Sequence, residues 1–111
     1  MKVNMRKRDG VTILDLKGKI TIGVGDVALR NAVQEAMNDG ANKIVINLRD
    51  VTTIDSSGVG ELVSAYTSAT NRGAKLALVN LPAKVSDILY ITQLITVFDV
   101  FDSEDEALRS F

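Results

Sequence analysis

Hydrophobic and polar residues follow two different periods along this chain, and the change from one to the other outlines its elements. Weak alternation over residues 3–8 and clearer alternation over residues 11–17 surround Asp9-Gly10, a dipeptide that favours a two-residue hairpin turn. An almost unbroken apolar run over residues 43–48 is typical of an interior strand. The first half of the chain therefore predicts an antiparallel hairpin and a strand covered on both faces.

Apolar residues spaced three and four positions apart predict two longer helices. The first spans residues 26–39, with Asp26 in the N-cap position. The second spans residues 57–72 and turns one apolar face toward the interior. The segments before them, residues 18–25 and 49–56, are predicted as loops, the first of them extended in part.

The last third of the chain continues the same alternation. An apolar run predicts a strand over residues 75–80, and Pro82 suits the first turn of a third helix. Residues 97–101 predict an edge strand. Ser103 and Glu106 have the spacing of a capping box, which predicts a short final helix.

The order of these elements, a hairpin followed by alternating helices and strands, predicts one α/β domain over residues 1–111. Its sheet is expected to be mixed, with four or five strands, and to be accompanied by about four helices. The chain has 111 residues, enough to bury most of its apolar surface without disulfides or metals. Its 46% hydrophobic and 24% charged residues agree with a globular domain.

Two residue types that carry much protein chemistry are missing from the chain, because it contains neither cysteine nor histidine. This excludes disulfides, thiolate chemistry, imidazole bases and the usual zinc sites. A net charge of −1 gives no reason to expect nucleic acid or a membrane surface as a partner. The N-terminal residues lack the apolar core of a signal peptide, and no apolar run approaches membrane-spanning length, so we expect a cytoplasmic protein.

The most informative stretch is Asp55-Ser56-Ser57-Gly58-Val59-Gly60, which lies between a predicted strand and a predicted helix. Such residues often serve only to cap a helix and turn the chain. Two glycines in the first helical turn are costly, however, and make sense where something must approach the backbone closely, such as a partner or a kinase. A helix N-terminus also favours negative charge, so Ser57 is a candidate for phosphorylation.

A second constellation has the outline of a dinucleotide-binding fingerprint. Gly23-Val24-Gly25-Asp26-Val27-Ala28 follows an extended segment and precedes a helix, but the next strand lacks the expected acidic residue. Enzymatic uses of Ser57 find no support, because no histidine activates it and no Ser-x-x-Lys or phosphate-binding G-x-x-x-x-G-K motif is present. We therefore predict a protein that is not an enzyme, with a nucleotide-binding domain using Gly23 and Gly25 as a remote alternative.

With these motifs in place, the chain resembles the STAS domain family, and specifically the anti-sigma factor antagonists. The resemblance extends from about residue 3 to residue 108 and is most specific at residues 54–60. It is supported by the strand at 43–48 before this stretch, and by Gly73-Ala74-Lys75-Leu76 and Leu81-Pro82 after it.

The resemblance implies partner switching controlled by one serine. In the family the second serine of Asp-Ser-Ser-Gly is phosphorylated, which is Ser57 here. The unmodified protein would bind an anti-sigma factor that is a serine kinase and so release the sigma factor, and a PP2C-type phosphatase would reverse the modification. Asp55 would fix the loop. The surface that partners read would then comprise Thr53, Ser56, Gly58 and Gly60.

The chain departs from the family pattern after its second strand. Many antagonists carry Gly-x-x-Asp there, whereas this chain reads Gly18-Lys19-Ile20-Thr21, so Thr21 takes the position of the aspartate and Asp26 is a candidate to replace it. STAS-like domains also serve as interaction subunits of transport, lipid-trafficking or stress-sensing complexes. That function is the alternative to a sigma-factor pathway. We expect a monomer or weak dimer without cofactor or metal.

Overall fold

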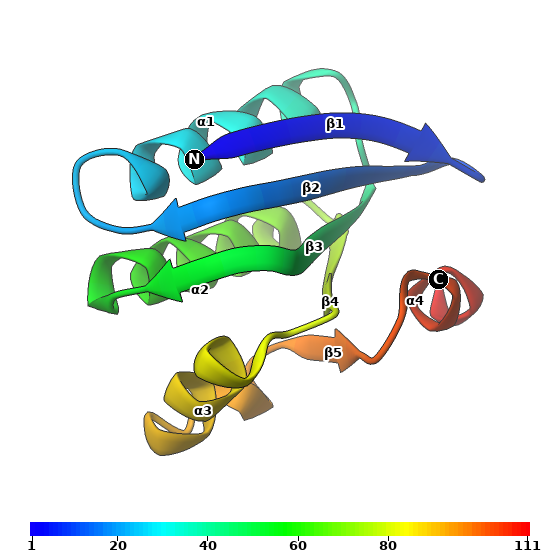
Figure 1. Cartoon of the computed structure of the whole chain (residues 1–111). Helices are drawn as coiled ribbons and strands as arrows, with labels where there is room; N and C mark the ends of the chain where they lie inside the picture. Colours follow the sequence, from blue (N-terminus) through cyan, green and yellow to red (C-terminus); the bar gives the residue numbers. More distant parts are fainter.

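A five-stranded sheet forms the middle layer of the molecule (Figure 1). The structure is a computed structural model that describes all of residues 1–111. The strands are β1 (Lys2–Arg8), β2 (Val11–Ile20), β3 (Lys43–Ile54), β4 (Lys75–Val79) and β5 (Asp99–Phe101). The helices are α1 (Gly25–Asn38), α2 (Ser56–Asn71), α3 (Ala83–Ile91) and α4 (Glu104–Ser110), and the short 3-10 helix η1 (Leu94–Thr96) follows α3.

The strand order is β1-β2-β3-β4-β5, and only the pairing of β1 with β2 is antiparallel. The predicted turn is confirmed, because Asp9 and Gly10 both have positive φ values, 53° and 78°, which a two-residue hairpin of this twist requires. The other neighbours are parallel, and a helix connects each pair. The predicted mixed sheet and α/β class are thus confirmed, and the C-terminal ends of β2, β3 and β4 meet at one edge of the sheet.

Two strands are longer than their sequence patterns predict. Strand β2 continues to Ile20 and β3 to Ile54, so residues 18–20 and 49–54 of the segments predicted as loops belong to the sheet. The added residues pair with each other, for example Ile20 with Ile54. Register shifts interrupt this pairing, one of them beside Gly18, whose φ is +112°. Because a bulge breaks the two-residue period, the alternation that marks a strand ends before the strand does.

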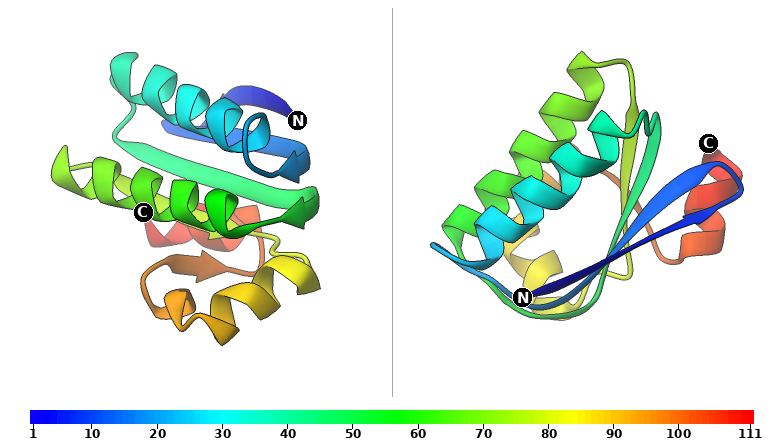
Figure 2. Two further views of the ribbon diagram at one scale, coloured as in Figure 1. Left: turned by 90° about the vertical axis from the view of Figure 1, so that its left-hand side faces the viewer. Right: turned by 90° about the horizontal axis from the view of Figure 1, so that it is seen from above.

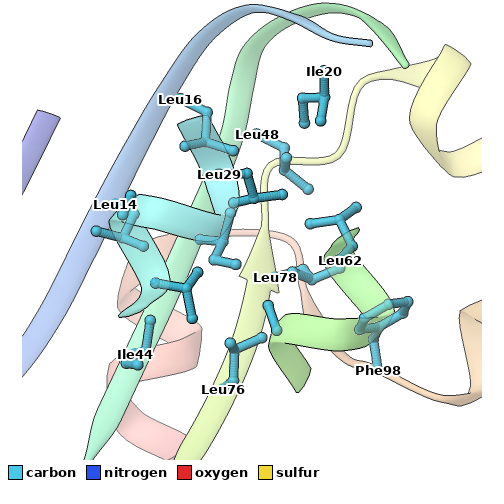
Figure 3. Packing of buried hydrophobic residues seen from close by; sticks show 14 of the residues in the cluster. Leu14, Leu16, Ile20, Leu29, Ile44, Leu48, Leu62, Leu76, Leu78 and Phe98 are labelled. Atoms are coloured by element: carbon cyan, nitrogen blue, oxygen red, sulfur yellow. The ribbon is translucent and has the colours of Figure 1, made fainter. Parts of the chain in front are cut away.

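Buried side chains form two clusters, one on each face of the sheet. Figure 2 shows α1 and α2 side by side on one face and α4 on the other. The larger cluster joins the sheet to α1, α2 and α3, and Figure 3 shows Leu14, Ile44 and Leu78 gathered with Leu29 of α1 and Leu62 of α2. The smaller cluster lies under α4. Because helices cover both faces, the central strands are apolar along their length.

Ion pairs connect α4 to β1, the edge strand on the opposite side of the sheet from β5. Arg6 bonds both Asp15 and Glu104, and Arg8 bonds Glu104 at 2.7 Å and Asp105 at 2.8 Å. The guanidinium groups of Arg6 and Arg8 hold the pKa of the Glu104 carboxyl below its usual range. The two ends of the chain are therefore joined through charged side chains more than 90 positions apart in the sequence.

The C-terminal elements follow the predictions with small shifts. The Ser103 hydroxyl accepts the Glu106 N–H at 3.2 Å, as in a capping box. The Glu106 carboxylate accepts the N–H of Asp102, one residue before the cap, at 3.4 Å. Pro82 occupies the N-cap position of α3 rather than its first turn. The edge strand begins at Asp99 rather than residue 97, because residues 97 and 98 form the turn that follows η1. No helix has the length and apolar character that crossing a bilayer requires.

Candidate functional site

The candidate site lies where the β2–α1 loop meets the start of α2. One carboxylate joins these two segments, because Asp55 accepts the Gly58 N–H through Oδ1 and the Ile22 N–H through Oδ2, both at 2.9 Å. Asp55 is thus the N-cap of α2 and also a clamp on a loop 33 positions away. The donated N–H groups of Gly58 and Ile22 hold the pKa of its carboxyl below the usual range.

This clamp predicts a pH-dependent contribution of Asp55 to stability. Because the pKa is lower in the folded state, the stabilisation is present above the unfolded value, about 3.9, and is lost as the pH falls through the folded value. We expect Asp55→Asn to lower the denaturation midpoint at pH 7 and to differ less from wild type as the pH approaches 3. The exposed Asp87 on α3 supplies the control, Asp87→Asn. A constant gap between Asp55→Asn and wild type at every pH would contradict the clamp.

The hydroxyl groups of the site differ in accessibility. Ser56 is exposed at the first position of α2, whereas Ser57 and Thr53 are half-buried. Gly60 is exposed, with nothing within 4 Å of the place where a Cβ would stand. Ser56 and Gly60 therefore lie on the surface, and Ser57 is partly accessible at its edge.

Gly58 is buried, which corrects the prediction that it forms part of the exposed surface. A Cβ on Gly58 would lie 2.2 Å from the Ile20 carbonyl oxygen and 2.7 Å from Cγ1 of Ile54. The atoms that approach this glycine closely therefore belong to the ends of β2 and β3. Gly25 has the same role, since its Cβ would lie 2.0 Å from the Lys19 carbonyl oxygen. Both glycines allow a helix start to pack onto the end of β2.

The buried side chain of Asp26 holds the β2–α1 loop by hydrogen bonds to backbone N–H groups. Its Oδ1 accepts the Gly23 N–H at 2.9 Å and the Val27 N–H at 2.8 Å, and only 9% of the residue is exposed. The prediction that Asp26 is the N-cap is wrong, because Val24 occupies that position. The Thr21 carbonyl accepts the Asp26 backbone N–H at 3.2 Å. The Gly23 and Val27 N–H groups that a nucleotide phosphate could use at this helix start are already bonded to Asp26.

Sequence reasoning missed an apolar surface beside the serines. Ile22 is 74% exposed, Val24 is 65% exposed and Val27 is 38% exposed, and the bond from Ile22 to Asp55 places this loop next to the start of α2. Apolar residues on both sides of Gly23, within a segment predicted as a loop, were the available signal. Such residues on an exposed loop are typical of surfaces that contact other proteins.

Comparison with known proteins identifies the family. Residues 2–107 match the model of the STAS domain. The chain belongs to the STAS domain family. A protein of Thermotoga maritima, assigned by its name to the anti-sigma factor antagonists, is 32% identical over 101 residues, which are 91% of this chain and 89% of that protein. The resemblance seen in the sequence is therefore confirmed.

Solved structures agree with this STAS assignment. A crystal structure of a Thermotoga maritima protein named in the same way has a TM-score of 0.89 and 30% identity, covering 97% of this chain and 92% of that one. The Bacillus cell fate determinant SpoIIAA, solved in its phosphorylated form, has a TM-score of 0.73 and 18% identity over 98% of each chain. At that identity the second likeness shows a shared fold.

Proposed function

We propose that this STAS domain is an anti-sigma factor antagonist that binds a serine-kinase anti-sigma factor until Ser57 is phosphorylated. The observation that carries the proposal is the position of Ser57, in the first turn of α2, where the Asp55 clamp fixes the backbone. Ser57 is partly accessible there and lies beside the exposed loop of Ile22 and Val24. Binding would release the sigma factor, and a PP2C-type phosphatase would restore the unmodified protein.

The surroundings of Ser57 explain why a phosphate would act as a switch. Without it, the surface combines the apolar side chains of Ile22 and Val24 with the neutral hydroxyl of Ser56. A phosphate adds about −1.5 to −2 charges at neutral pH. A partner surface that fits uncharged groups would have to desolvate this charge, so the same contact becomes unfavourable.

The exposed members of the site are the groups that a partner would read. Ser56 and Gly60 stand at the surface of α2, with Thr53 at their edge, and Thr21 lies in the adjoining loop. Asp55 and Asp26 act indirectly by holding the two segments that carry these groups. The buried Gly58 serves the packing of α2 instead.

Phosphorylation of the purified protein by its cognate kinase and ATP tests the proposal directly. We expect mass spectrometry to place one phosphate on Ser57, leaving the adjacent and more exposed Ser56 unmodified. Ser57→Ala should abolish incorporation, whereas Ser56→Ala, the matched control one position away, should retain it. Phosphate on another residue, with Ser57→Ala still accepting it, would refute the assignment.

A further inference from the structure

An ion pair connects the two helices that begin at the candidate site. Arg30 of α1 donates to Glu61 Oε1 of α2 through Nη2 at 2.6 Å and through Nε at 3.1 Å. Only 14% of the Glu61 side chain is exposed, whereas 52% of the Arg30 side chain is exposed. The carboxylate is therefore held in the groove between the helices, while the guanidinium reaches it from the rim.

Ser57 lies one helical turn before Glu61 on the same face of α2. Residues four positions apart on a helix have Cβ atoms about 5–6 Å from each other. That face of α2 continues through Ala65 and Ser68, which line the groove opposite Val33 and Met37 of α1. Ser57 therefore lies on the same face of α2 as the groove residues, one turn before the Glu61 carboxylate that Arg30 binds.

The charges around Ser57 are mostly negative. Asp55 precedes it, Glu61 lies one turn beyond it, and Asp26 occupies the first turn of the neighbouring α1. Arg30 is the cation among them, one turn after Asp26 and paired with Glu61. A phosphate on Ser57 would thus be added between Asp55 and Glu61 in the α2 sequence, with Arg30 as the cation already paired to Glu61.

We propose that Arg30 exchanges partners when Ser57 is phosphorylated, leaving Glu61 and binding the phosphate. This inference rests on the proposed modification of Ser57. The phosphate carries more negative charge than the Glu61 carboxylate and has three acceptor oxygens. The planar guanidinium of arginine binds such a group through two parallel hydrogen bonds. Because the Arg30 side chain is half-exposed, its guanidinium can move from Glu61 to the position of Ser57, one turn earlier on α2, without disturbing the core.

The exchange would extend the effect of the phosphate from Ser57 to Glu61 and to the contact between α1 and α2. Glu61 loses its cation and faces the phosphate four positions away, an arrangement of like charges that is unfavourable on a helix. The α1–α2 contact then runs from Arg30 to Ser57 instead of Glu61, so both helices present a different surface. Phosphorylation would thus alter the groove as well as the loop surface.

The test uses protein in which phosphoserine is inserted at position 57 during translation, so that it does not depend on any kinase. Phosphorus NMR follows the second ionisation of the phosphate, which lies near pH 6 for phosphoserine. A nearby guanidinium favours the dianion and lowers this midpoint. We expect Arg30→Gln to raise it by about half a pH unit, whereas Arg72→Gln, at the far end of α2, should leave it unchanged.

A second measurement needs no variant. In the wild-type phosphoprotein the Arg30 Nε–H signal should shift with the same pH midpoint as the phosphorus signal, and in the unmodified protein it should not. The proposed exchange would be wrong if the phosphate titrated with the same midpoint in Arg30→Gln and Arg72→Gln. It would also be wrong if the Arg30 Nε–H signal did not shift as the phosphate titrates. Neither result bears on whether the kinase modifies Ser57, so the two proposals fail separately.

Discussion

Replacing Gly58 by alanine is expected to lower the free energy of unfolding by about 2–4 kcal/mol. The new Cβ would stand 2.2 Å from the Ile20 carbonyl oxygen, a backbone atom that cannot rotate away. Relief requires α2 to move off the end of β2, which would stretch the hydrogen bond from the Ile22 N–H to Asp55. The substitution therefore affects packing and the candidate site together.

Gly60→Ala is the matched control, because Gly60 lies two positions later in the same helix with open space around it. Alanine is better than glycine inside a helix by about 0.5–1 kcal/mol, so this variant should be more stable than wild type. Urea denaturation followed by circular dichroism compares the two. If both variants were destabilised equally, the close contact of Gly58 with Ile20 would not be the cause.

The fold was predictable from local patterns wherever those patterns were regular. The Asp9-Gly10 turn, the run at residues 43–48 and the periodic helices determined the hairpin, the interior strand and the α/β class. The strand ends were hidden because bulges near Gly18 interrupt the alternation. Whether residues 49–54 form a strand depends on their pairing with the end of β2, and that pairing is not encoded in either segment alone.

The candidate site was predictable in part. Asp55 was expected to fix the loop, and the structure adds that it is the N-cap of α2 and accepts the N–H groups of Gly58 and Ile22. The function assigned to Gly58 was wrong because a glycine required for packing and one required for partner access look alike in sequence. The Arg30–Glu61 pair was missed because it depends on how two helices are placed side by side.

Ser57→Asp is expected to weaken binding to the kinase anti-sigma factor roughly 100-fold, whereas Ser57→Ala should bind like wild type. Aspartate places one negative charge beside Asp55 and Glu61, so a complex must bury a charge where the unmodified protein offers a hydroxyl. Calorimetry with the purified kinase measures both affinities. The 100-fold figure is a lower bound for the phosphate, which carries more charge and reaches further.

Two controls separate this electrostatic effect from other causes. Thr70→Asp adds the same charge at an exposed position near the C-terminal end of α2, so it should bind like wild type if location matters. At 0.1 M salt, interactions between exposed charges more than about 10 Å apart are largely screened, and this distance shortens as salt is added. Raising the salt concentration should therefore recover part of the affinity lost by Ser57→Asp. Equal affinities for Ser57→Asp and Ser57→Ala would exclude an electrostatic switch at this position. A loss shared with Thr70→Asp would instead indicate that net charge alone controls binding.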